Sequence, residues 1–251
     1  MSCPGELPHW ELRVPSFLES LGAFLLVLPG VAWSVKALFG ADSVRSIAAH
    51  SGELVLALAL VIIVHEAVHA LVYALGGVGV SAGLGTYYAY VAAKRPLSKK
   101  LFVTSALSPL IVISVASAAL ARAIPEFGSL LQMIFALNAL GSVGDLILTL
   151  RVLPAPADAT IVDAGASALV CLPQPETRPS PRWWGILSGF LRVFPLALAI
   201  SVIIGIFLQP GRFCCEKGVG FEIEISVGAL EYALAIAIGG LVTTIRFAVR
   251  R

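Results

Sequence analysis

The stretch Val61–Tyr73, VIIVHEAVHALVY, decides how this chain can fold. It places His65, Glu66 and His69 inside an apolar run that is long enough to cross a lipid bilayer. Each ionisable group near the centre of such a span costs about 2.5–3.5 kcal/mol and therefore needs a partner or a wet cavity. A single histidine on an apolar face is usually a core residue, but three such groups within five positions indicate a functional cluster.

The spacing of these residues is typical of a metal site. Positions i and i+4 lie one turn apart on the same helix face, so the imidazoles of His65 and His69 can bind one ion. In His-Glu-x-x-His sites two neutral histidines hold Zn²⁺, and the glutamate takes a proton from a metal-bound water whose pKa falls to about 7. The pattern predicts metal ligands at His65 and His69 and a general base at Glu66.

The rest of the chain has the composition of a polytopic membrane protein. Of its 251 residues, 58% are hydrophobic and 13% are charged, with a mean hydropathy of +0.93, whereas soluble domains average about 25% charged residues. The net charge of +2, without a basic run that interleaves aromatic residues, argues against nucleic acid as a partner. Glu6 and Glu11 do not fit a cleaved signal peptide, so we expect the first apolar segment to stay in the protein.

Six apolar segments are long enough to span a bilayer, which takes about 20 residues. They are residues 17–39, 54–75, 101–123, 127–150, 185–208 and 227–247. The predicted fold is an all-α polytopic membrane protein of about six transmembrane helices, in a single membrane domain over residues 1–251. Pro29 and Gly30 predict a kink in the first span.

The positively charged residues predict the orientation of these spans. Eleven Lys and Arg residues fall on the side of the two termini and five on the other side, with Arg192 inside a span. Because cytoplasmic loops carry the excess of Lys and Arg, both termini should face the cytoplasm. The second and fourth spans then place His65, His69 and Asp145 in the cytoplasmic half of the cell membrane.

The segment after the histidine motif, residues 76–100, predicts a small β-hairpin. It has too many glycines for a helix, and Val78, Val80 and the Thr86–Val91 run favour two short strands. A hairpin that re-enters the membrane could offer a strand edge to an extended peptide. The alternative is an interfacial loop, because its tyrosines also suit a membrane–water boundary.

A second short hairpin is predicted in the cytoplasmic loop 152–184. Thr160–Val162 and Ala168–Leu172 could pair around a turn at Asp163–Gly165. This hairpin is too short to bury a core of its own, so it should lie against the membrane domain or a partner.

A third metal ligand must come from another span, because catalytic zinc usually has three protein ligands. The chain has four aspartates, and only Asp145 lies within a predicted span, where a buried carboxylate needs a cationic partner. Asn138 and Ser142 precede it on nearly the same helix face. We predict that Asp145 ligates the metal, that Asn138 donates to a scissile carbonyl or oxyanion, and that Ser142 supports helix packing.

These motifs resemble a known family. HEAVHA in a span, a glycine-containing hairpin segment after it and an Asn…Asp pair in a later span resemble the site-2 protease family of intramembrane zinc metalloproteases. The arrangement N-x3-S-x2-D, with LFVTSALSPLIVI between the motifs, is more similar to the zincin-type membrane peptidases related to that family. The resemblance covers about Leu54–Asp163.

The resemblance implies a role for each matched residue. His65, His69 and Asp145 would bind one zinc ion, Glu66 would act as the general base, and Asn138 would help to hold the substrate or the oxyanion. Site-2 proteases usually carry an Asn-Pro-Asp-Gly type motif, which is absent between Asn138 and Asp145. The backbone around Asp145 should therefore differ from theirs.

Together the residues predict a zinc metalloendopeptidase that hydrolyses a peptide bond in or near a transmembrane segment of another membrane protein. One alternative is a zinc or divalent-metal transporter, although such carriers usually have more histidines and the reverse order of motifs. Another is a catalytically inactive relative that binds a membrane partner. The four cysteines, Cys3, Cys171, Cys214 and Cys215, form no C-x-x-C pair and no cysteine metal site, and we assign no role to the vicinal Cys214 and Cys215.

Overall fold

The computed structural model describes residues 3, 9–13, 15–40, 51–84, 89–163, 167–172, 182–208, 233, 235–240 and 243. The chain divides into two compact units. The first comprises Met1–Pro15 with Leu26–Pro181, and the second comprises Ser16–Leu25 with Arg182–Arg251. The expectation of a single membrane domain remains a prediction.

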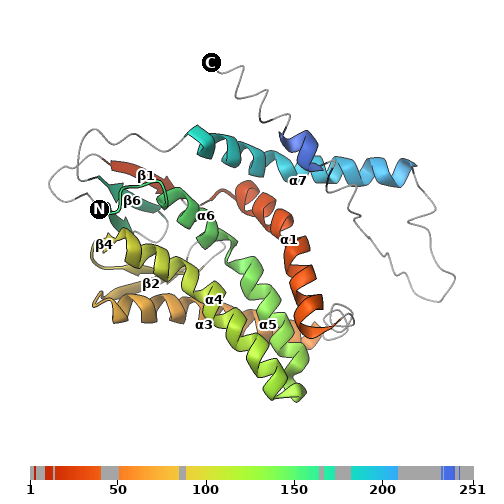
Figure 1. Ribbon diagram of the computed structural model, residues 1–251, viewed down its shortest axis with the longest axis horizontal. Helices are drawn as coiled ribbons and strands as arrows, with labels where there is room; N and C mark the ends of the chain where they lie inside the picture. The colour runs from red at the N-terminus through yellow and green to blue at the C-terminus, as the bar shows by residue number, and fades with distance from the viewer. Residues whose placement is uncertain are drawn as a thin grey trace. The chain divides into compact units, whose positions relative to one another are not determined.

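Long apolar helices form most of the first unit. Helix α3 (Ser51–Leu75) is followed by α4 (Lys99–Ala123), a short 3₁₀ turn, η2 (Pro125–Phe127), then α5 (Gly128–Gly141) and α6 (Val143–Val152). Helices α3, α4 and α5 pack against one another (Figure 1). Helix α1 (Phe17–Phe39) begins in the second unit and ends in the first.

Four helical segments are long and apolar enough to cross a membrane. They are Phe17–Phe39, Glu53–Leu75, Lys99–Ala123 and Pro125–Val152. They coincide with the first four predicted spans. The fifth prediction coincides with α7 (Arg182–Leu208), where Gly185–Ala199 is a shorter apolar stretch. The sixth, 227–247, lies largely outside the described residues, so the count of six is not established.

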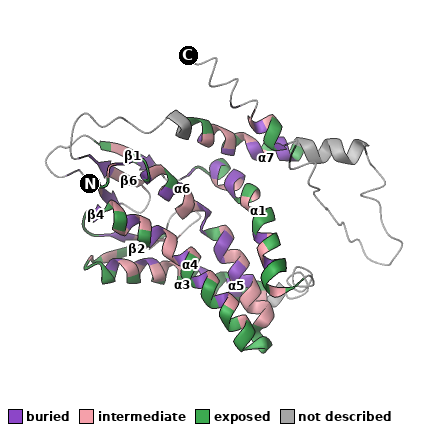
Figure 2. Ribbon diagram, in the orientation of Figure 1, coloured by how far each residue is buried: buried purple, intermediate pink, exposed green. Residues whose placement is uncertain are grey.

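The outer face of α3 is suited to lipid rather than to water. Exposed residues recur along the helix (green in Figure 2), and many of them are large and apolar. They include Leu54, Val55, Leu58, Ile62, Ile63, Leu71 and Leu75. A soluble helix would carry polar residues on this face. The exposure pattern therefore supports a membrane protein.

Helix α3 ends where the sequence supplies glycine. Gly77 has a φ of +72°, a left-handed conformation that side chains other than glycine rarely adopt. The Gly77 N–H donates to the Ala74 carbonyl, and the Val78 N–H donates to the Tyr73 carbonyl. These two bonds satisfy carbonyls of the last turn in a Schellman arrangement. The chain then turns directly into the hairpin beside the histidine motif.

The predicted hairpin after α3 is confirmed. Strands β2 (Val80–Leu84) and β3 (Ala89–Ala93) pair antiparallel, with Ala82 opposite Val91. The Lys94 N–H donates to the Gly79 carbonyl at 2.8 Å. Because bonding alternates along an antiparallel pair, β3 turns the N–H groups of Val91 and Ala93 away from β2.

The second predicted hairpin is also confirmed, and it belongs to a larger sheet. Strands β5 (Thr160–Asp163) and β6 (Ser167–Cys171) pair antiparallel. Strand β1 (His9–Arg13) adds to β6, and the two-residue strand β4 (Leu97–Ser98) adds to β5. The order is β1-β6-β5-β4. The sequence analysis did not predict β1 and β4, because their partners lie far away in the chain.

This sheet packs on the ends of the helices. Leu12, Ile161 and Val170 from the sheet share one apolar core with Tyr73 of α3 and Phe102 of α4. As expected, the hairpin does not form a core alone. The sheet thus brings together the segment before α1, the end of α3, the start of α4 and the end of α6.

A disulfide joins Cys3 to Cys171, with their Cα atoms 5.7 Å apart. Both cysteines are buried beside Val162. The sequence analysis made no prediction of this pairing. No sequence pattern pairs cysteines that are separated by 168 positions. Cys214 and Cys215 lie outside the described residues.

In the second unit, the first turns of α1 pack against α7. Ser16 and Glu19 form a reciprocal capping box, in which each side chain accepts the backbone N–H of the other residue. The Glu19 carboxylate also accepts from the Ser188 hydroxyl and pairs with Arg192 of α7 at 3.2 Å. These partners account for a buried glutamate in an apolar helix.

Candidate metal centre

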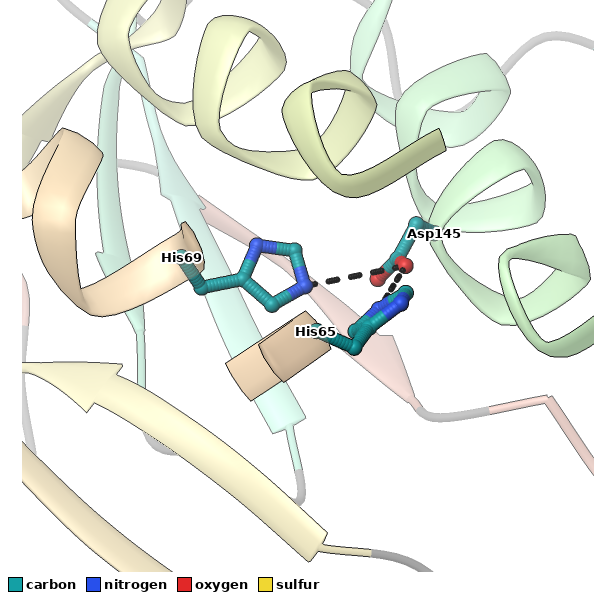
Figure 3. Close-up of side chains that lie close together, drawn as sticks. All are labelled: His65, His69 and Asp145. Carbon is teal, nitrogen blue, oxygen red and sulfur yellow. Dashed lines mark hydrogen bonds and ion pairs between the residues drawn. The ribbon is translucent and has the colours of Figure 1, made fainter. Parts of the chain in front are cut away.

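Two helices bring the three predicted ligands together. His65 and His69 lie one turn apart on α3, and Asp145 lies in the first turn of α6. Their candidate ligand atoms are all within 4.8 Å of one another. The Asp145 Oδ2 atom is 3.0 Å from Nε2 of His65 and 3.7 Å from Nε2 of His69 (Figure 3).

The His65 ring is oriented by a side chain. Its Nδ1 lies 3.2 Å from the Asn138 Oδ1 atom of α5, which can only accept, so Nδ1 donates. The Asn138 amide nitrogen donates to the Pro109 carbonyl at 3.1 Å and to the Ser114 hydroxyl at 3.3 Å. Asn138 is fully buried. The Asn138 side chain is thus fixed by α4 and in turn orients the His65 imidazole.

The His69 ring is oriented by a backbone carbonyl. Its Nδ1 lies 2.9 Å from the Ser105 carbonyl oxygen of α4 and therefore donates to it. The Ser108 hydroxyl donates to the same carbonyl at 2.8 Å. Both ligand histidines thus have an acceptor behind Nδ1 and direct Nε2 at Asp145.

This arrangement calls for a cation among the three residues. A neutral imidazole that donates from Nδ1 has only a lone pair at Nε2. Two such lone pairs and a carboxylate oxygen would then meet with no hydrogen between them. A metal ion, or a proton on one Nε2 atom, removes the repulsion, and an acceptor behind each ligand histidine is the usual outer partner in metal sites. The residues therefore fit a metal centre.

The spacing and chemistry of the donors suit zinc. Two imidazole nitrogens and a carboxylate oxygen are ligands that zinc accepts, and tetrahedral bonds of about 2.0–2.1 Å separate neighbouring ligand atoms by about 3.3 Å. The distances of 3.0 and 3.7 Å from Asp145 Oδ2 to the two Nε2 atoms bracket that separation. All three candidate ligand atoms lie within 4.8 Å of one another, so the group would close further around a bound ion.

Asp145 owes its position to a break between two helices. Helix α5 ends at Gly141 and α6 begins at Val143, so Ser142 caps both. The Ser142 hydroxyl donates to the Asn138 carbonyl at 2.8 Å, and the residue is fully buried. Because Asp145 then lies in the first turn of α6, the positive end of the helix dipole favours its negative charge.

Glu66 lies between the ligand histidines and the hairpin. Its carboxylate interacts with both histidines and with the backbone N–H of Val91 in β3. Its Oε2 atom is buried and has no hydrogen-bond partner among the residues that the structure describes. A buried acceptor without a donor costs stability. A water molecule or substrate group would satisfy it, as the predicted general base requires.

The structure adds residues that the sequence analysis missed. Ser105, Pro109 and Ser114 of α4 hold the imidazoles directly or through Asn138. Their sequence signal was a Ser-Pro pair in a span. That pair alone does not indicate which carbonyl would be left for another group. Asn138 lies beside His65, but both donors of its amide are used in this arrangement, so its predicted role at the oxyanion has no free N–H.

Comparison with known proteins gives two matches. Residues 58–160 match a family model described as "Putative zincin peptidase". The chain is also 35% identical over 139 residues to an "Uncharacterized 24.7 kDa protein in gap 5'region" of Pyrococcus woesei. That alignment covers 53% of this chain and 60% of the relative, so it spans less than two thirds of that protein. No solved structure matches.

The family match covers the whole candidate centre. It includes both histidines, Glu66, Asn138 and Asp145, together with the hairpin β2–β3. The match supports a zincin-like peptidase and indicates zinc as the metal. A relation to site-2 proteases in particular is not part of it.

Proposed function

We propose that this chain is an intramembrane zinc metalloprotease that cleaves a peptide bond in or near a transmembrane segment of another protein. One observation carries the proposal: two imidazoles and a carboxylate converge beside a glutamate that has an unsatisfied buried oxygen. All four residues belong to segments apolar enough to cross a membrane. The match to zincin peptidases supports the peptidase part.

In this proposal His65, His69 and Asp145 hold one zinc ion, and Glu66 moves the proton. Bound zinc would supply Lewis-acid activation of water and of the scissile carbonyl. The Glu66 carboxylate takes the proton of the attacking water and returns it to the leaving amine. Its unsatisfied Oε2 atom is the acceptor available for that proton. Asn138 and the Ser105 carbonyl keep both imidazoles oriented throughout.

Strand β3 is the surface on which an extended substrate would bind. The Val91 N–H faces Glu66, on the edge of β3 that is turned away from β2. A substrate unwound from its own helix would gain backbone hydrogen bonds by pairing with the part of this edge before Ala93, whose N–H already donates to Asp163. Its peptide bonds would then pass beside Glu66. This supports an extended peptide as the substrate class.

The proposed orientation places both termini and the site toward the cytoplasm. The positive charges favour it, whereas the Cys3–Cys171 disulfide lies on the same side as the segment before α1. Disulfides persist in oxidising compartments and in the cytoplasm of hyperthermophiles. Reporter fusions at the N-terminus and in the 209–226 segment would determine the orientation directly.

The zinc content of detergent-purified protein tests the centre. We expect about one zinc per chain in the wild type, and loss of most of it in Asp145→Ala. Asp158→Ala is the matched control, because this exposed aspartate lies outside the spans. A folded wild type without zinc would overturn the proposal. Intramembrane cleavage is tested with a single-span protein in liposomes, which zinc-loaded wild type should cut and chelator-treated wild type should not.

A further inference from the structure

Pro109 lies inside α4, the helix that holds the partners of both ligand histidines. It is buried, and its own carbonyl accepts the Asn138 amide behind His65. Four residues earlier, the Ser105 carbonyl accepts Nδ1 of His69. A proline inside a helix usually costs about 3 kcal/mol. Its place at this point therefore needs a reason.

The missing N–H of Pro109 explains why the Ser105 carbonyl is available. In a regular helix the N–H of residue i bonds to the carbonyl of residue i−4, which for position 109 is Ser105. Proline has no N–H, so this carbonyl is left without its usual helical donor. Two side chains use it instead: His69 Nδ1 at 2.9 Å and Ser108 Oγ at 2.8 Å.

We propose that Pro109 is a positioning residue for the metal centre, because it withholds a backbone donor from Ser105 and so reserves that carbonyl for His69. The inference rests on the proposed function. A carbonyl oxygen has two lone pairs, and His69 and Ser108 fill both. An N–H at position 109 would compete for them. His69 would then lose the acceptor that fixes its Nδ1–H tautomer and points Nε2 at Asp145.

The test compares three full-length variants in detergent. Pro109→Ala restores the N–H and should strengthen the helix, yet we expect zinc affinity to fall about 10- to 100-fold, the usual cost of losing an outer partner. Pro29→Ala is the matched control, because Pro29 also lies inside an apolar helix but away from the site. Its zinc affinity should equal that of the wild type. Competition with a chromophoric chelator measures all three.

A third replacement separates two effects of Pro109, the absence of an N–H donor and the shape of the proline ring. Position 109 is filled with lactate, the α-hydroxy acid that corresponds to alanine and has neither a ring nor an N–H. If the absent donor is the cause, this protein should keep nearly wild-type zinc affinity while Pro109→Ala does not. A loss as large as that of Pro109→Ala would overturn the proposal.

The nitrogen spectrum of the histidines gives a readout that does not need metal or activity. The chain has four histidines, so ¹⁵N-histidine labelling yields few signals. We expect Pro109→Ala to shift the His69 Nδ1 signal, and Pro29→Ala to leave it in place. An unchanged signal with unchanged zinc affinity would overturn the role of Pro109. If the wild type binds no zinc, the proposed function fails, while the His69 signal still tests the role of Pro109.

Discussion

The metal centre around His65, His69 and Asp145 is organised by a few buried polar groups, which form hydrogen bonds between neighbouring helices. The four-stranded sheet at the helix ends is held instead by backbone pairing, an apolar core and the Cys3–Cys171 disulfide. In the metal centre each polar group has a specific task, and its loss should change the chemistry while the fold remains. In the sheet the contributions are shared, so a loss there should lower stability and leave the centre intact.

One carboxylate links the two regions by hydrogen bonds. Asp163, at the end of β5, accepts from the Tyr73 hydroxyl of α3 at 3.2 Å and from the Ala93 N–H of β3 at 3.3 Å. Tyr73 lies one turn beyond His69 on the same helix face. The sheet is thus attached both to the helix that carries the ligands and to the strand that faces Glu66. If every substitution in the sheet also weakened zinc binding, the sheet and the metal centre would not be separable.

The largest effect is expected at the centre itself. Glu66→Gln should lower peptide hydrolysis by at least about 10²–10⁴-fold, because the amide cannot accept the proton of water. Zinc content and thermal stability should stay close to wild type, since Glu66 is not among the three ligands. Glu126→Gln, at an exposed position in η2, is the control. Retained hydrolysis in Glu66→Gln would rule out this base.

Removing the disulfide should affect the other region. Cys3→Ala leaves β1 joined to β6 by backbone pairing and by the apolar core around Leu12, and a native disulfide typically contributes about 2–4 kcal/mol. We expect a lower apparent Tm in detergent, with zinc affinity of the folded protein unchanged. Reductant should lower the Tm of the wild type in the same way and have no further effect on Cys3→Ala. A loss of zinc affinity would show that the two regions are not separable.

The metal centre could be predicted because its signals are local or rare. His65 and His69 are four positions apart, so helix geometry alone places them on one face. Asp145 was found because it is the only aspartate within a predicted span. Both hairpins follow from short β-prone runs around turn residues. In each case a few neighbouring residues contain the information.

The remaining features depend on contacts between distant segments. Strand β1 pairs with β6, and Cys3 with Cys171, although about two thirds of the chain separates them. Local preference cannot choose such partners. The acceptors behind the histidines, Asn138 and Ser105, depend on the rotation of α4 and α5 against α3. One sequence does not specify that rotation, so the partners of the ligands could not be predicted.

A smaller change should separate two roles for Asn138. If Asn138 orients His65, Asn138→Leu should weaken zinc binding about 10- to 100-fold. If it served the oxyanion instead, zinc affinity would stay and the maximal rate of hydrolysis alone would fall. Gln132→Leu is the matched control, because it removes another amide from α5, one whose Oε1 is buried without a partner in the described structure. Chelator competition measures zinc affinity in both variants.

The smallest effect is expected where the regions join. Tyr73→Phe removes one hydrogen bond to Asp163, which contributes about 0.5–1.5 kcal/mol. We expect the amides of β3 to exchange with deuterium up to about tenfold faster, while zinc content stays the same. Tyr90→Phe, on β3 itself, is the control. Faster exchange in Tyr73→Phe alone would mean that Asp163 attaches the hairpin to the ligand helix. Equal exchange in both variants would mean that the hairpin is held by its own pairing and by the shared apolar core, and not by the hydrogen bond to Asp163.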